Sequence, residues 1–106
     1  MKVGIFNGTV ATTNGLYRVS DLSVSEAKKL LCENGYVSAI GHESTAKIIS
    51  ELMEMDIQMN RINFEQMVNQ KAVVFKLNKR PEEGTVLTRA QVEEVGYSFK
   101  LMERLE

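Results

Sequence analysis

The chain has 106 residues, which is enough for one modest hydrophobic core, and residues 1–106 are expected to form a single domain. Thirteen basic and fourteen acidic residues give a formal net charge of −1, which argues against a long nucleic acid as partner but leaves room for a small anion bound locally. The sequence has no run of about 18 apolar residues and meets polar residues early, so neither a membrane span nor a signal peptide is predicted, and a cytoplasmic protein is expected.

Strands and helices alternate in the first part of the sequence. The apolar run over 3–6 stops at Asn7-Gly8 and predicts a buried strand that ends in a turn. A loop rich in turn-forming residues follows, and a short strand is predicted over 16–19. Ser23-Val24-Ser25-Glu26 matches a capping box, which predicts a helix that continues until Asn34-Gly35.

The only cysteine, Cys32, lies on this predicted helix. One cysteine cannot form an intramolecular disulfide, which favours a reducing compartment. Its position beside Leu31 predicts a core residue rather than a nucleophile.

The middle of the chain predicts a strand over 36–40 and then a helix. Gly41-His42 marks the crossing between them, and the helix carries an apolar stripe formed by Ile48, Ile49, Leu52 and Met53. After Asp56 the pattern is weaker, and apolar residues over 57–64 suggest extended segments. His42 is therefore predicted to lie at a junction between a strand and a helix.

The last part of the chain predicts a strand, a turn, a helix and a final strand. The strand covers 72–77, and Arg80-Pro81-Glu82-Glu83-Gly84 forms the turn. Thr88-Arg89-Ala90-Gln91 is a second capping box, and its helix ends at Gly96. In the final strand, from Tyr97 onward, apolar residues alternate, so one face is expected to be buried and the other polar. Together these elements predict an α/β fold: a mixed sheet of roughly five strands, partly parallel and flanked by helices.

His42 is the only histidine in the chain and the natural candidate for proton transfer. Imidazole has an ordinary pKa of about 6.5, and a helix N-terminus offers free N–H groups to an anion, so the position suits phosphate chemistry. The competing interpretation is that His42 only caps the helix or makes structural hydrogen bonds.

Two further segments accompany the one around His42. They are Asn60-Arg61-Ile62, and the turn from Arg80 to Gly84 with Leu87-Thr88. A guanidinium group stays protonated and can bridge two phosphate oxygens, so Arg61 and Arg80 are candidate phosphate ligands. Either arginine could instead be an ordinary surface charge.

In order, spacing and identity, the segments at His42, Arg61 and Arg80 resemble those of the small viral and mobile-element ring nucleases. These act as anti-CRISPR proteins against type III systems and have standalone cellular relatives. The likeness covers nearly the whole chain, and the opening strand that ends in Asn7 also fits it. Lys76 and its neighbours before the Arg80 turn depart from the pattern of some relatives, as does the loop over 7–14, which leaves the preferred ring size open.

The resemblance implies an enzyme that binds cyclic tetra-adenylate in a cleft between the two subunits of a homodimer. Such an enzyme cleaves the ring to linear di-adenylates that carry 2′,3′-cyclic phosphate, with no metal or other cofactor. In this implied site His42 is the catalytic histidine and Arg61 and Arg80 bind phosphate. Glu83 matches an acidic residue close to the catalytic site, and Asn7 and Ser44 match positions that line the cleft.

Several alternatives remain open at this stage. A carboxylate near bound phosphates is electrostatically unfavourable, so Glu83 needs a specific role. It would orient His42, activate the sugar hydroxyl or act across the dimer. A non-catalytic binder of cyclic nucleotides would need the same arginines but no histidine placed for proton transfer. A third hypothesis is an interaction protein or DNA-associated factor of a mobile element. A metal hydrolase is disfavoured, because the chain has only one histidine and one cysteine as candidate ligands besides its carboxylates. Viral, mobile-element and cellular origins are equally compatible with the sequence, as are immune evasion and signal shut-off.

Overall fold

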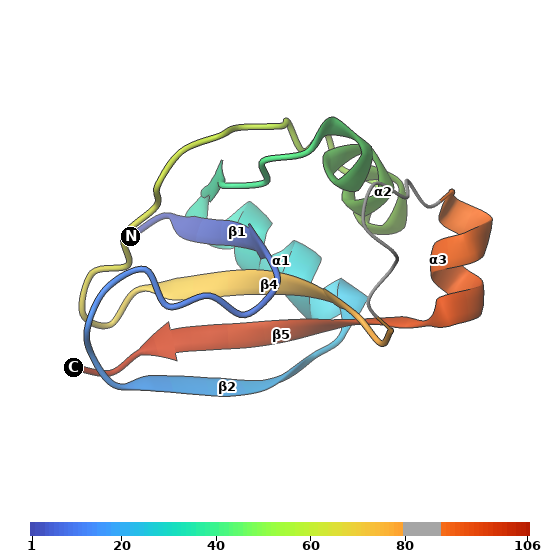
Figure 1. The fold of residues 1–106 in the computed structure, drawn as a ribbon. Helices are drawn as coiled ribbons and strands as arrows, with labels where there is room; N and C mark the ends of the chain where they lie inside the picture. The colour runs from blue at the N-terminus through green and yellow to red at the C-terminus, as the bar shows by residue number, and fades with distance from the viewer. Residues whose placement is uncertain (80–87) are drawn as a thin grey trace.

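The computed structural model describes residues 1–79 and 88–106, and within them it contains five strands and three helices (Figure 1). In chain order they are β1 (Val3–Asn7), β2 (Tyr17–Leu22), α1 (Val24–Asn34), β3 (Tyr36–Ser38), α2 (Glu43–Met53), β4 (Lys71–Leu77), α3 (Arg89–Val95) and β5 (Tyr97–Arg104). The predicted α/β fold with a mixed sheet of five strands is confirmed.

The sheet has the strand order β2-β5-β4-β1-β3. β1 runs parallel to both of its neighbours, β3 and β4, whereas β5 pairs antiparallel with β4 and β2. The carboxyl ends of the three parallel strands therefore meet at one edge of the sheet, which is where ligands bind in many open α/β folds. Asn7 ends β1 at this edge, and the chain reaches His42 shortly after β3 ends.

All three helices contribute to the apolar core on one face of the sheet. The buried members of this core are Val3, Ile5, Ala27, Leu31, Ile40, Ala46, Ile49, Met53, Ile57, Val73, Phe75, Val92 and Phe99. The predicted stripe of α2 is present, because Ile49 and Met53 are buried and Ile48 and Leu52 pack against the same core.

The opposite face of the sheet carries a smaller apolar cluster, formed by Phe6, Ala72, Val74 and Met102. We call this side of the sheet the open face. Long connections rather than helices run along it in Figure 1, and Phe64, from one of them, packs against the cluster. The second face of the last strand was predicted to be polar, and it carries Ser98, Lys100 and Arg104, but Met102 on the same face is buried to 1% exposure. A second apolar layer supplied by loops gives no periodic signal in the sequence.

Both predicted capping boxes are present. Ser23 and Glu26 cap the start of α1 reciprocally, and Thr88 and Gln91 do the same for α3. The prediction for Cys32 is wrong: its side chain is exposed while neighbouring Leu31 is fully buried. Side chains of consecutive helical residues point about 100° apart, so Cys32 can face solvent although Leu31 next to it faces the core.

The connection from α2 to β4 contains no strand within the described residues, although apolar residues over 57–64 had suggested extended segments. Side chains take up its backbone groups instead. The Ser50 hydroxyl accepts a hydrogen bond from the Ile57 N–H and also contacts the Ile57 carbonyl, and the Ser38 hydroxyl donates to the Gln58 carbonyl at 2.6 Å. These hydrogen bonds hold the connection beside β3, close to the segment that leads to His42.

The end of β5 is tied to two loops through Arg104. Its Nη1 donates to the Gln66 carbonyl at 2.6 Å, its Nη2 to the Asn14 carbonyl at 3.2 Å and its Nε to the Glu106 carbonyl at 3.2 Å. One side chain thus joins the loop after β1, the connection before β4 and the end of the described chain.

In the ranges 1–79 and 88–106, none of the helices is both long and apolar enough to cross a membrane.

Candidate functional site

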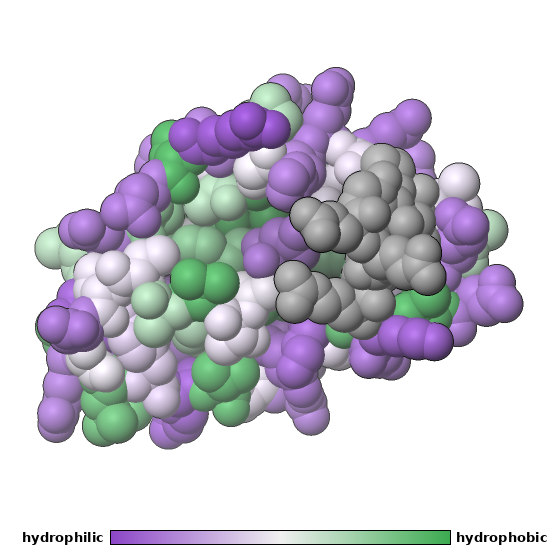
Figure 2. Space-filling model, viewed as in Figure 1, coloured by the Kyte–Doolittle hydropathy of each residue, from purple (hydrophilic) through white to green (hydrophobic). Residues whose placement is uncertain are grey.

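A hollow of about 280 Å³ lies on the open face, next to the carboxyl ends of β1 and β3. It is lined by Phe6, Asn7, Val10, Thr12, Ala39, Gly41, His42, Ile62, Asn63 and Phe64. Figure 2 views this face and shows the surface recessed between the strands and the connection that passes above them. Three separate segments build the walls: the end of β1 with its loop, the turn into α2, and the connection after α2.

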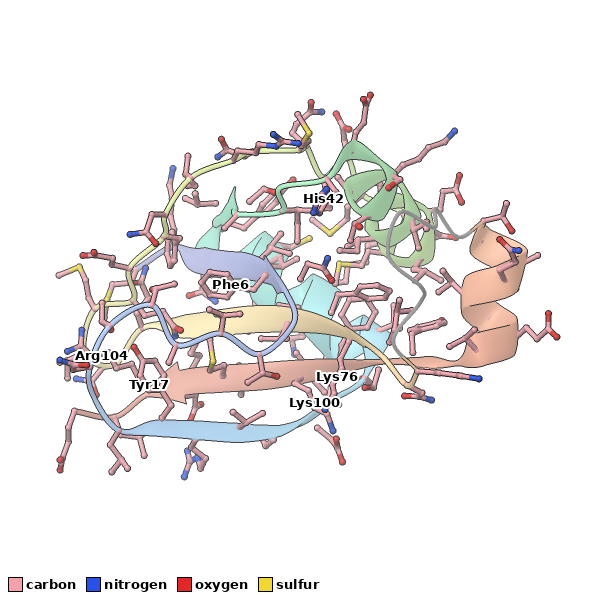
Figure 3. The ribbon with its side chains drawn as sticks, in the orientation of Figure 1. Phe6, Tyr17, His42, Lys76, Lys100 and Arg104 are labelled. Atoms are coloured by element: carbon pink, nitrogen blue, oxygen red, sulfur yellow. The ribbon has the colours of Figure 1, made fainter. Side chains whose placement is uncertain are left out.

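His42 stands at the N-cap of α2 with extended backbone angles of φ −128° and ψ 129°. Its carbonyl accepts the first helical hydrogen bond, from the Ala46 N–H at 3.1 Å, but its side chain makes no capping hydrogen bond. The side chain is exposed and borders the hollow (Figure 3). Among the described residues the imidazole has no hydrogen-bond partner, so the capping role considered for it is not filled by its ring.

The connection after α2 fixes the segment that leads to His42. The Asn60 N–H donates to the Ile40 carbonyl at 2.8 Å, and the Asn60 side chain donates to the Ser38 carbonyl at 2.9 Å. Arg61 follows, and its Nε donates to the Gly41 carbonyl at 2.8 Å. Two neighbouring residues of one connection thus bind three carbonyls in the segment before His42, those of Ser38, Ile40 and Gly41.

Phe64 holds the opposite wall of the hollow together. Its ring meets Phe6 edge-on, with ring centroids 5.7 Å apart, and its carbonyl accepts a hydrogen bond from the Thr12 hydroxyl at 2.6 Å. It also lies directly over Gly4: a Cβ added there would stand 2.8 Å from Phe64 Cε1. At position 4 of β1, only glycine leaves room for the Phe64 ring.

Replacing Gly4 with alanine is expected to lower the free energy of unfolding by about 1–3 kcal/mol, because the new methyl group overlaps the Phe64 ring. Denaturant unfolding measures the change. In a Phe64→Ala background the same substitution should cost less than about 0.5 kcal/mol, since the obstructing ring is gone. Equal costs in both backgrounds would show that Phe64 does not depend on the space above Gly4.

The site residues predicted from the sequence fall into three groups. Asn7 and His42 line the hollow, and Arg61 contacts Gly41 in its wall. Ser44 lies in the first turn of α2, beyond the lining residues of the described chain. Arg80 and Glu83 lie outside the described residues.

Sequence reasoning missed two features of this face. The Phe6–Phe64 pair could not be found, because the two rings come from segments far apart in the sequence. Lys76 on β4 and Lys100 on β5 were also missed. Both lie on the open face, near one another, where alternation along two adjacent strands sets them as diagonal neighbours (Figure 3). Finding the two lysines as neighbours would have required the register of β4 against β5.

Asp21 on β2 moderates the positive charge of Lys100. The ammonium group of Lys100 donates a hydrogen bond to the Asp21 carboxylate, and this bond, together with the attraction between the charges, lowers the pKa of Asp21. Lys76 makes no such ion pair within 1–79 and 88–106. Of these two lysines, Lys76 is therefore the one whose charge is not offset by an ion pair within the described residues.

No group of three or more histidine, cysteine, aspartate and glutamate side chains that could hold a metal ion occurs within the described ranges.

Comparison with known proteins gives a consistent set of similarities. The model of the STIV B116-like family matches residues 3–99. The uncharacterized protein YddF of Bacillus subtilis (strain 168) is 35% identical over an alignment of 108 residues that covers both chains completely. The uncharacterized protein 26 of a Sulfolobus islandicus filamentous virus is 38% identical over 84 residues, which cover 78% of this chain and 71% of the viral one.

The fold also matches a solved structure. B116 of Sulfolobus turreted icosahedral virus superposes with a TM-score of 0.73 over 96% of this chain and 98% of its own, at 23% sequence identity. At this identity the likeness concerns the fold alone.

Proposed function

The chain belongs to the STIV B116-like family, a family with viral members and a Bacillus relative, and from that premise we propose that it is a metal-independent ring nuclease. In this proposal it binds cyclic tetra-adenylate at the hollow beside His42 and cleaves it to linear di-adenylates. The resemblance of the segments at His42, Arg61 and Arg80 to ring nucleases supplies the substrate. The biological role is evasion of type III CRISPR defence, or shut-off of its signal.

The observation that carries the proposal is the state of His42. The chain's single histidine borders an open hollow, and its ring is not used for capping. A structural histidine at a helix start would be expected to donate or accept a local hydrogen bond. An exposed imidazole beside a helix N-terminus is instead available to meet a bound phosphate and to transfer a proton to it.

The proposed reaction uses a nucleophile that RNA carries itself. The ribose 2′-oxygen attacks the adjacent phosphorus and forms the cyclic phosphate, the bond from phosphorus to the 5′-oxygen breaks, and the 2′-hydroxyl proton passes to solvent. The His42 imidazolium donates a proton to the departing 5′-oxygen. What remains for the protein is to hold the ribose and phosphate in line and to stabilise charge on the phosphoryl oxygens.

Cationic side chains supply that charge stabilisation in the proposal. Arg61 uses its Nε for the Gly41 carbonyl and keeps both terminal nitrogens for phosphate oxygens. Lys76 adds a positive charge on the same face of the sheet. The resemblance assigns phosphate binding to Arg80 as well, and gives Glu83 a place close to the catalytic histidine.

The size of the hollow supports a dimer as the working unit. At about 280 Å³ it is near the lower limit of pockets that hold drug-sized molecules, so it holds only part of a cyclic tetranucleotide. A second copy related by a two-fold axis would supply a second hollow and a second His42 for the other half of the ring. Val10 and Ile62 at the rim expose 50% and 44% of their surface, which suits burial against a partner.

The decisive experiment is to incubate the purified protein with cyclic oligoadenylates of several ring sizes in the presence of EDTA. Cyclic tetra-adenylate is expected to be converted to linear di-adenylates with 2′,3′-cyclic phosphate ends, identified by mass spectrometry. Activity that disappears in EDTA and returns on addition of a divalent metal would contradict the proposed mechanism. Tight binding without any product would favour the non-catalytic binder instead.

A further inference from the structure

The hydrogen bond from Arg61 to Gly41 joins a candidate phosphate ligand to the residue that precedes His42. We propose that Arg61 is a positioning residue for His42, in addition to any contact it makes with phosphate. The Arg61 Nε holds the Gly41 carbonyl at 2.8 Å and so sets the direction in which the chain enters α2. The expected effect of Arg61 on cleavage rests on the proposed function, whereas its effect on the placement of His42 concerns the ligand-free protein.

Gly41 is the residue with the widest choice of backbone angles in the path to His42. On one side Ile40 is fully buried in the core, and on the other side the His42 carbonyl is already bound in α2. Gly41 stands between these anchors without a side chain of its own, and glycine has the widest choice of backbone angles. His42 does not stabilise the turn with its own ring, because it makes no capping bond. The restraint on Gly41 has to come from another segment.

Arg61 provides that restraint in two ways. Besides the hydrogen bond, its side-chain stem packs against the glycine: Arg61 Cγ lies 3.6 Å from the point where a Gly41 Cβ would stand. The stem is itself anchored, since the preceding residue Asn60 binds the carbonyls of Ile40 and Ser38. The guanidinium group, although exposed, is thus hydrogen-bonded to the same backbone that carries the imidazole.

The shape of the guanidinium group allows both roles at once. Nε points along one edge of the planar group, and the two terminal nitrogens form a separate fork suited to phosphate oxygens. A phosphate bound by that fork would be placed relative to His42 through a single rigid group. Lysine preserves the charge but lacks both the Nε donor and the fork, so positioning is judged from the rate at saturating ligand, which does not depend on affinity.

The test compares the wild type, Arg61→Lys and Arg61→Ala, with Arg18→Lys on β2 as the matched control. Arg18 pairs with Glu103 and does not line the hollow. Affinity for cyclic tetra-adenylate and the single-turnover rate at saturating ligand are measured for each protein. In parallel, proton NMR of the ligand-free proteins follows the Hε1 signal of His42, which needs no assignment because the chain has one histidine.

Arg61→Lys is expected to lose less affinity than Arg61→Ala, because one positive charge remains, while its saturating rate falls by about tenfold, the effect of one lost positioning hydrogen bond. Its His42 signal should move, and the Arg18→Lys signal should not. Arg61→Ala should lose affinity as well. An unchanged saturating rate or an unmoved His42 signal in Arg61→Lys would overturn the proposal. If the wild type cleaves no ring of any size, the proposed function fails, while the NMR comparison still decides whether Arg61 positions His42.

Discussion

Replacing His42 with alanine is expected to lower the single-turnover cleavage rate of cyclic tetra-adenylate by about 10²–10⁴-fold, the usual contribution of a positioned general acid. Affinity should change little, because the arginine and lysine side chains supply most of the attraction for phosphate. The melting temperature should also stay close to that of the wild type, since the imidazole makes no capping hydrogen bond. Rate, affinity and thermal unfolding are measured on the same preparation.

His42→Asn is the matched control for the structural interpretation. Asparagine is among the best N-cap residues, so this variant should be at least as stable as the wild type and yet as inactive as His42→Ala. The wild-type single-turnover rate should fall as the pH rises from about 6 to about 9, because the reaction needs the protonated form of an imidazole. A flat profile over that range, or an active His42→Asn protein, would remove the histidine from the mechanism.

Replacing Arg104 with alanine is expected to reduce the free energy of unfolding by about 2–3 kcal/mol, the largest loss of stability that we expect from a single polar residue here. Its guanidinium group donates to the carbonyls of Gln66, Asn14 and Glu106, and Gln66 is only 2% exposed. All three acceptors would lose their charged donor. Chemical denaturation gives the change directly.

Arg18→Ala is the appropriate comparison, since it removes another arginine from the neighbouring strand. Arg18 forms an ion pair with Glu103, but its side chain is 66% exposed, and such surface pairs contribute about 1 kcal/mol or less. Arg104→Lys should fall between wild type and Arg104→Ala, because one ammonium group cannot reach three separate carbonyls. Equal losses for Arg18→Ala and Arg104→Ala would show that the carbonyl contacts of Arg104 add nothing to an ordinary surface charge.

The features that could be predicted from the sequence are those set by local chemistry. The capping boxes at Ser23 and Thr88 depend on side chains three residues apart, and both helices begin as expected. The junction at His42 was predictable for the same reason, because Gly41 and the apolar spacing that follows mark a helix start. The strand predicted over 16–19 was found only in part, because β2 extends to Leu22. Its polar residues Ser20 and Asp21 are tolerated there because β2 is an edge strand that pairs on one side alone.

The features that could not be predicted depend on which distant segments meet. Nothing near Gly4 in the sequence indicates that Phe64 will lie over it, and nothing near Arg61 indicates that its Nε will bind Gly41. Lys76 and Lys100 become neighbours only through the register of β4 and β5. The walls of the hollow are therefore a product of the tertiary fold, although Asn7 and His42 were identified from the sequence.

The pairing of β2 also determines the order in which a newly made chain can fold. β2 contacts the sheet only through β5, so this early strand leaves the ribosome long before its partner is synthesised. The parallel strands β1, β3 and β4 can associate meanwhile, but closing the β2–β5 pair requires a contact that spans most of the chain and is slow to form. During that wait β2 is an unpaired strand, and such strands promote aggregation when they are apolar. Arg18, Ser20 and Asp21 make it a polar strand, which protects the nascent protein until the last strand arrives.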